Sequence, residues 1–169
     1  MARYTAAVTW ERREAPFTDL RYNRAHRWRF DGGLDVPASS SPHHVKVPLS
    51  DPAGVDPEEA LVAALSSCHM LSFLYLAAKR GVVVERYDDA AEGEMTENEQ
   101  GRLAITRVVL RPRVTYAPHA PADAAAEASL HHEAHEQCYI ANSVRTEVVI
   151  EPRTRGVTPT HEVVRDVSA

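Results

Sequence analysis

The sequence predicts an α+β fold in which helices cover one face of an antiparallel sheet. Three observations carry this prediction. The expected elements follow one another in the order strands, helix, strands, helix, strand. Residues 61–78 form a helical segment that is apolar nearly all round, which favours a central helix buried on most of its faces. The 169 residues, 44% of them hydrophobic and 25% charged, suffice for a single domain with a sizeable core.

The N-terminal third is expected to form strands and a hairpin. Runs of β-branched and aromatic side chains predict strands at residues 3–10 and 26–30. The turn residues 31–33, Asp-Gly-Gly, predict a hairpin from the second strand into residues 34–36. The proline- and serine-rich stretch 37–57 predicts a loop, with one short edge strand around Val45 and Val47.

The long apolar helix has clear start and stop signals. Asp56 can cap it, Pro57 suits its first position, and Glu59 completes a capping box. Lys79 and Arg80 favour the negative end of the helix dipole, and the glycine after them ends the helix. The apolar run is short for a membrane span and contains serines and a histidine, so a buried core helix is the prediction.

The second half of the chain continues the mixed pattern. Strands are expected at residues 82–87, 89–95, 103–116 and 145–151, and a helix at about 122–137. Pro112 favours an edge or a bulge within the third of these strands. The polar tail 153–169 is expected to lie outside a core of about residues 4–152, with the whole of 1–169 as one domain.

Charge and cysteine content narrow the class of protein. A net charge of −5 and a pI near 6.0 give no electrostatic footprint for nucleic acid or an anionic membrane. Two cysteines are too few for a secreted disulfide scaffold, and the N-terminus lacks the apolar run of a signal peptide. The expected compartment is a reducing cytoplasm, where thiols stay free unless a protein uses them.

The two cysteines are therefore the main candidates for chemistry. Cys68 lies in the apolar helix, and Cys138 closes a second helix-like segment, 70 residues later. If the fold brings them together they make a redox pair; otherwise they are small buried hydrophobes, the common fate of free cysteine.

Three segments resemble the OsmC/Ohr superfamily of thiol-dependent hydroperoxide reductases. Residues 56–69, DPEEALVAALSSCH, look like the family's Asn-Pro-Glu-Glu…Cys helix. Residues 134–143, AHEQCYIANS, resemble its second cysteine motif, and residues 22–26, YNRAH, resemble its arginine segment. One position departs from the family pattern: Tyr139 stands where a proline often follows the second cysteine.

The resemblance implies antiparallel sheets packed around a long buried central helix in an intertwined homodimer, with active sites at the subunit interface. It implies Cys68 as the peroxidatic thiol, Cys138 as the resolving thiol, and Arg24 and Glu58 as the polar pair at the site. The implied reaction reduces organic hydroperoxides to alcohols through a Cys68 sulfenic acid and a Cys68–Cys138 disulfide. No metal or organic cofactor is implied, and an external dithiol, of lipoyl or similar type, would recycle the enzyme.

The chemistry is consistent with these roles, with one geometric constraint. A thiolate attacks the O–O bond, and the permanent cation of Arg24, oriented by Glu58, favours the thiolate. In one straight helix, however, Glu58 and Cys68 are about 15 Å apart. Either the helix breaks near Ser66 and Ser67, or Glu58 serves the cysteine of the partner subunit.

Two other functions remain open at this point. His131, His135 and Cys138 fall on one stripe of a helix and are plausible zinc ligands, although surface histidines are the commoner explanation. His69, next to Cys68, is expected to be a packed core histidine. An OsmC-like redox-sensing or small-ligand-binding protein with little turnover is the second alternative. The apolar residues around Cys68 favour an organic hydroperoxide, but they are also typical of a core.

Overall fold

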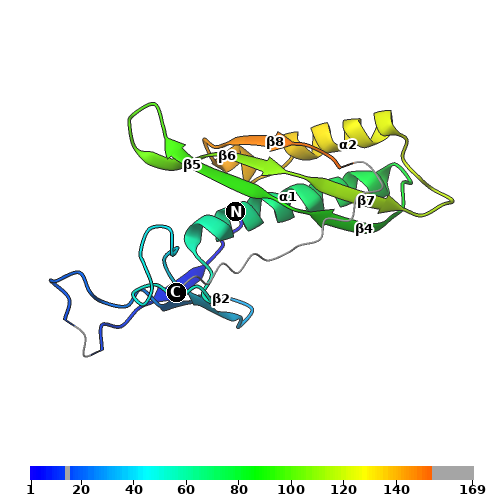
Figure 1. Ribbon diagram of the computed structural model, residues 1–169. Coiled ribbons are helices and arrows are strands. Elements are labelled where there is room, and N and C mark those ends of the chain that lie inside the picture. The colour runs from blue at the N-terminus through cyan, green and yellow to red at the C-terminus, as the bar shows by residue number, and fades with distance from the viewer. Residues whose placement is uncertain (14–15, 154–169) are drawn as a thin grey trace. The chain divides into compact units, whose positions relative to one another are not determined.

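The computed structural model describes residues 1–13 and 16–153, and its elements follow the expected order (Figure 1). The bounds are β1 (Ala6–Thr9), β2 (His26–Phe30), β3 (Asp35–Ala38), α1 (Pro57–Lys79), β4 (Val84–Asp89), β5 (Glu92–Glu97), β6 (Leu103–Leu110), β7 (Pro112–Tyr116), α2 (Ala124–Glu136), the 3₁₀ turn η1 (Ala141–Ser143) and β8 (Glu147–Ile150). The α+β class is confirmed. The expectation for the tail concerns residues that, except for the first, lie outside the described range.

The chain forms two compact units. Among the described residues, the first unit contains those within 1–67 and 93–106, and the second contains 68–92 and 107–153. The expectation of one domain over residues 1–169 therefore stays a prediction.

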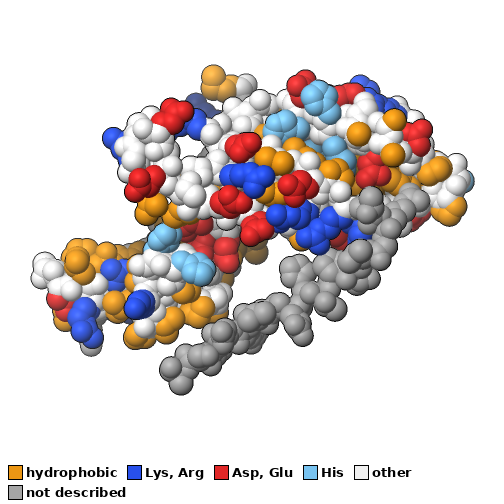
Figure 2. Space-filling model, turned by 45° about the horizontal axis from the view of Figure 1, so that its top comes forward, with side chains coloured by type: hydrophobic (Ala, Val, Ile, Leu, Met, Phe, Trp, Pro, Cys, Tyr) orange, Lys and Arg blue, Asp and Glu red, His pale blue; other side chains and the backbone are white. Residues whose placement is uncertain are grey.

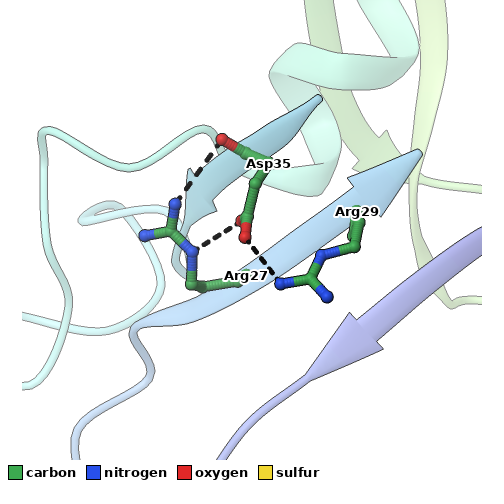
Figure 3. Close-up of polar contacts among 3 residues, drawn as sticks. All are labelled: Arg27, Arg29 and Asp35. Carbon is green, nitrogen blue, oxygen red and sulfur yellow. Dashed lines mark hydrogen bonds and ion pairs between the residues drawn. The ribbon is translucent and has the colours of Figure 1, made fainter. Parts of the chain in front are cut away.

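In the first unit, β1, β2 and β3 form an antiparallel sheet, and the hairpin between β2 and β3 is confirmed. Gly33 in its turn has a φ of +84°, a conformation that glycine adopts without strain. Across the hairpin, Asp35 binds two arginines of β2 (Figure 3). Its carboxylate accepts from Arg27 Nε at 2.6 Å and from Arg29 Nη2 at 3.1 Å. These contacts lower the pKa of Asp35.

The short edge strand expected around Val45 and Val47 is wrong. This segment forms turns, because the amides of His44 and Val45 both donate to the carbonyl of Ser41 instead of to a neighbouring strand. The loop's one described β contact is an isolated parallel bridge between Ala38 and Val55.

Helix α1 begins and ends as its sequence predicts. Its capping box is formed: the Glu59 amide donates to Asp56 Oδ1 at 2.7 Å, and the Asp56 amide donates to Glu59 Oε2 at 3.3 Å. At the other end Gly81 has a φ of +71°, and the amide of Val82 donates back to Ala77. The helix runs without a break between these ends.

The expectation that α1 is buried on most faces is wrong for the single chain. Its fully buried side chains form one stripe with helical spacing: Leu65, His69, Phe73, Leu76 and Ala77. Leu71 and Tyr75, on other faces, are 63% and 60% exposed. By length and composition alone α1 could cross a membrane, but core helices of soluble proteins meet the same criterion.

The second unit holds the main core. Phe73, Leu76 and Ala77 of α1 pack with Leu130 and Ala134 of α2, and with the β7 residues Val114 and Tyr116. Strand β7 pairs antiparallel with β4. Asp123 caps α2, accepting from the amide of Ala126 at 2.8 Å.

Two details of the strands differ from expectation. Residues 103–116 form two strands, because the chain changes sheet at Arg111 and Pro112 becomes the first residue of β7, where a missing amide is tolerated. The final strand β8 pairs with β6 in parallel, from Arg107 opposite Glu147 to Leu110 opposite Ile150. A parallel partner requires a long connection, and β7 with α2 supplies it.

The surface carries interleaved charge. Figure 2 shows acidic and basic side chains side by side on the face that it presents. The second unit contains such pairs, with Arg111 Nη1 2.8 Å from Glu92 and Arg86 Nη2 2.7 Å from Asp88. Exposed pairs of this kind contribute little to stability individually.

Candidate active site: a dithiol beside a buried histidine pair

The fold of the second unit brings Cys68 and Cys138 together. Cys68 lies on α1 and is half-buried, whereas Cys138 lies just beyond the end of α2 and is only 1% exposed. Both thiols are free, and interaction with Cys68 is among the causes that raise the pKa of Cys138, so the two side chains are neighbours. Neighbouring thiols are the arrangement from which an oxidant can form a disulfide.

The backbone after α2 holds Cys138 in place. Its amide donates to the carbonyl of His135 at 3.2 Å, and its sulfur accepts from the amide of Ala141 at 3.4 Å. In the 3₁₀ turn that follows, Asn142 Nδ2 donates to the carbonyl of Glu136 at 2.9 Å. Tyr139, which departs from the family pattern, is 81% exposed.

The environment of Cys138 favours the protonated thiol over the thiolate. Burial, and next the hydrogen bond with Cys68, raise the pKa of Cys138 to about 11; the amide of Ala141 opposes this shift. Thiolate is the reactive form of cysteine, so Cys138 is a poor nucleophile at neutral pH without help.

A pair of histidines lies buried between the same two helices. His69 Nε2 of α1 and His131 Nδ1 of α2 are 3.1 Å apart, and their rings are nearly parallel with centroids separated by 5.4 Å. The Phe73 ring packs 4.4 Å from His131. Burial lowers the pKa of each histidine to about 4, and for His69 the neighbouring imidazoles add to the effect. Both are therefore neutral at physiological pH.

The prediction that His69 is a packed core histidine is confirmed. Its pairing with His131 was missed, because neither helix by itself shows which residue lies opposite. A signal was present: His69 and Phe73 are four residues apart on α1, and His131 and His135 are four apart on α2, so each pair shares a helix face.

No three histidine, cysteine or acidic side chains within residues 1–13 and 16–153 are grouped so that they could hold a metal ion. The zinc interpretation of His131, His135 and Cys138 therefore gains no support from the described part of the chain.

The expected polar pair, Arg24 and Glu58, belongs to the first unit. Arg24 lies in the loop before β2. Its Nη1 donates to the carbonyls of Leu20, at 2.9 Å, and Tyr22, and its guanidinium stacks 3.8 Å from the centre of the Tyr22 ring. Glu58 lies in the first turn of α1, and its Oε2 is buried without a described hydrogen-bond partner.

The continuity of α1 excludes one of the two ways in which Glu58 could reach a cysteine. A break near Ser66 and Ser67 was one way to bring Glu58 to Cys68 of the same chain, and no such break exists. The rise of a continuous helix over ten residues is about 15 Å. The other alternative, in which Glu58 serves the cysteine of a partner subunit, stays a prediction.

These features define an α+β protein with two neighbouring thiols, one on α1 and one just after α2. The chain belongs to the OsmC-like protein family, whose model matches residues 50–153. It is similar, at 52% identity and a TM-score of 0.88, to an OsmC-like protein of unknown function from Vibrio cholerae, with 90% of this chain and 100% of that one covered.

Its fold also matches two proteins named for organic hydroperoxide resistance. One is OsmC from Legionella pneumophila, at 18% identity and a TM-score of 0.62, with 90% of this chain and 97% of that one covered. The other is OhrB of Bacillus subtilis, at 20% identity and a TM-score of 0.61, with 89% and 98% covered. No curated protein matches the chain.

Proposed function

We propose that this protein is a thiol-dependent peroxidase that reduces organic hydroperoxides to alcohols. Cys68 attacks the peroxide O–O bond as the thiolate, releases the alcohol and becomes a sulfenic acid. Cys138 then attacks the Cys68 sulfur, which forms the disulfide and releases water. An external dithiol of lipoyl type reduces the disulfide and completes the cycle.

The proximity of the two thiols, brought together from α1 and the end of α2, is the observation that carries this proposal. Cys68, the more accessible thiol, suits attack on an external peroxide, while buried Cys138 suits the internal second step. Membership of the OsmC-like family, and the fold shared with proteins named for hydroperoxide resistance, agree with this assignment.

We also propose that the active protein is a homodimer whose Glu58 and Arg24 act at the partner's Cys68. Leu71 and Tyr75 leave apolar surface of α1 exposed, and a second copy would cover it. The buried, unpartnered Oε2 of Glu58 lacks a donor, and an arginine would supply one.

The first experiment measures peroxide consumption with dihydrolipoamide as reductant. Cumene hydroperoxide and hydrogen peroxide are compared for wild type, Cys68→Ser and Cys138→Ser. We expect rapid turnover of the organic peroxide, complete loss in Cys68→Ser, and one oxidation event without disulfide in Cys138→Ser. Absence of turnover in the fully reduced wild type would refute the proposal.

Arg24 has a matched control in the same unit. Arg24→Gln is expected to lower kcat/KM about 10-fold or more, because it removes the cation that favours the thiolate. Arg27→Gln should leave kcat/KM unchanged, since Asp35 already neutralises Arg27 (Figure 3). An equal loss of kcat/KM in both variants would show that Arg24 has only a structural role.

Mixing inactive variants tests which subunit supplies Glu58. If Glu58 acts on the partner's cysteine, heterodimers of Cys68→Ser with Glu58→Gln contain one intact site, and activity returns on mixing. If Glu58 acts within its own chain, every site in the mixture stays defective. Light scattering on the same samples gives the oligomeric state.

A redox sensor with little turnover is the second candidate, and the raised pKa of Cys138 favours it because resolution would be slow. Stoichiometric formation of the disulfide without repeated dithiol-driven cycles would select the sensor over the enzyme.

A further inference from the structure

His26, the first residue of β2, makes hydrogen bonds through both of its ring nitrogens. Its Nδ1 is 2.8 Å from the carbonyl oxygen of Arg24, and its Nε2 is 2.9 Å from the indole Nε1 of Trp28. All three residues belong to the first unit and are half-buried. The imidazole therefore connects the sheet to the loop that carries the arginine.

The two neighbours of His26 require the same tautomer of its ring. An indole nitrogen only donates, so the Nε2 of His26 is the acceptor and carries no proton. The proton of a neutral imidazole is then on Nδ1, where it faces a carbonyl oxygen, which only accepts. Trp28 thus donates to His26, and His26 donates to the carbonyl of Arg24. Both bonds together hold the ring in one orientation.

Other groups hold the backbone on both sides of Arg24. The Arg24 amide donates to the carbonyl of Leu49 at 2.8 Å. The amide of Ala25 donates to Asn23 Oδ1 at 2.6 Å, and the carbonyl of Asn23 accepts from Trp10 Nε1 at 2.8 Å. The bond to the imidazole adds the carbonyl of Arg24 to these anchored groups. The arginine side chain therefore starts from a fixed piece of backbone.

The guanidinium of Arg24 is oriented within the same loop. Its Nη1 donates to the carbonyls of Leu20, at 2.9 Å, and Tyr22, and its central carbon lies 3.8 Å from the centre of the Tyr22 ring. That ring in turn stacks on Phe17, with centroids 4.6 Å apart. The Nε and Nη2 groups form no hydrogen bond within the part of the chain that the structure describes, so they remain donors for a bound peroxide or a carboxylate.

We propose that His26, oriented by Trp28, is a positioning residue that holds Arg24 for catalysis. The inference rests on the proposed function, because it takes Arg24 as the cation at the reactive thiol. Removal of the imidazole leaves the Arg24 carbonyl and the Trp28 N–H without their partner. The arginine then samples more orientations, and a catalytic group that is held less firmly works more slowly.

A matched set of variants separates positioning from packing. His26→Phe keeps a ring of similar size, whose contact with Trp28 has centroids 6.0 Å apart in wild type, but it can neither accept nor donate a hydrogen bond. In His26→Asn the side-chain amide can replace Nδ1 and donate to the carbonyl of Arg24. Arg29→Gln is the control on the same strand, because the Arg29 side chain is 71% exposed and lies on the opposite face of β2.

The assay measures kcat/KM for cumene hydroperoxide with dihydrolipoamide as reductant. We expect His26→Phe to lower kcat/KM about 5-fold, His26→Asn to recover most of this loss, and Arg29→Gln to match wild type. In the Arg24→Gln background, His26→Phe should have almost no further effect, because a residue that acts through Arg24 has nothing left to position. The same loss in both backgrounds would overturn the inference, since general damage to the fold does not depend on Arg24.

The same variants distinguish failure of the inference from failure of the proposed function. If Arg24→Gln itself keeps the kcat/KM of wild type, the role of Arg24 in the proposed function fails, and the positioning role of His26 fails with it. If Arg24→Gln is slow but His26→Phe is as fast as wild type, the proposed function stands and the positioning inference alone fails.

Nuclear magnetic resonance examines the hydrogen bonds without turnover. In wild type we expect nitrogen shifts of a neutral His26 with its proton on Nδ1, and a slowly exchanging indole proton of Trp28. In His26→Phe that indole proton should exchange faster, and the heteronuclear NOE of the Arg24 amide should fall. Unchanged order at Arg24 in this variant would overturn the inference. If the variant fails to fold, the wild-type tautomer decides: a proton on Nδ1 supports the inference, and a proton on Nε2 overturns it.

Discussion

The buried histidine pair is expected to make the folded protein less stable in acid. Burial lowers the pKa of His69 and His131 from 6.5 to about 4. Between these values the unfolded chain binds protons at both residues, while the folded protein binds almost none. The histidine contribution to stability is therefore fully present above about pH 6.5 and is lost as the pH falls towards 4.

The size of the effect follows from the same two pKa values. At pH 5 protonation of each histidine favours the unfolded chain by about 2 kcal/mol, so the pair together lowers the free energy of unfolding by roughly 4 kcal/mol relative to pH 7.5. For a protein of ordinary stability this is a large part of the total.

Denaturant unfolding at pH 7.5 and 5, at one protein concentration and under reducing conditions, measures the effect. The double variant His69→Gln/His131→Asn should lose about 4 kcal/mol less than wild type on acidification, because amides do not titrate in this range. The exposed His132→Gln should follow wild type. If the double variant and wild type lose the same stability to within 1 kcal/mol, about the error of such measurements, the buried neutral pair is not what makes the fold acid-labile.

Three further predictions concern the core, a cap and the thiols. Phe73→Ala should lower the free energy of unfolding by about 3–5 kcal/mol, because it opens a cavity in the main core. In the same denaturant unfolding experiment, Leu103→Ala at an exposed position should change it by less than about 0.5 kcal/mol. Asp123→Ala should cost about 1 kcal/mol by removing the cap of α2, and a thermal shift no greater than that of Leu103→Ala would contradict this. At pH 8 iodoacetamide should alkylate Cys138 on the order of 100-fold more slowly in the native protein than in denaturant, and Cys68 should be modified first. Peptide mass spectrometry measures both rates. Equal rates for Cys138 in the native and denatured protein would exclude its raised pKa.

Much of the fold was predictable because its determinants are local. The capping box of Asp56 and Glu59, the glycine after Lys79 and the Asp-Gly-Gly turn each act over a few residues, so they indicate the same structure with or without the rest of the chain. The prediction failed where distant contacts decide. The loop around Val47 forms hydrogen bonds within its own turns, and β8 pairs in parallel with β6.

The candidate site also combines residues that the sequence motifs predicted with a contact that they did not predict. The motifs singled out Cys68, Cys138, Arg24 and Glu58, and the long helix suggested that Glu58 is too far from its own cysteine. The motifs did not show the His69–His131 contact, because 62 residues separate the two in sequence. A one-turn shift of α2 against α1 would change every facing pair without altering either helix pattern.

Sequence patterns alone predict the α+β class, the helix ends and the hairpin, because short-range hydrogen bonding and side-chain periodicity set these features. They also single out the two cysteines as candidate reactive residues. Three features appear only in the folded chain: Cys68 and Cys138 are neighbours, burial raises the pKa of Cys138, and two neutral histidines lie against each other between the helices. Packing of α1 against α2 sets these contacts, and that packing depends on how the whole core of Phe73, Leu130 and their neighbours fills space.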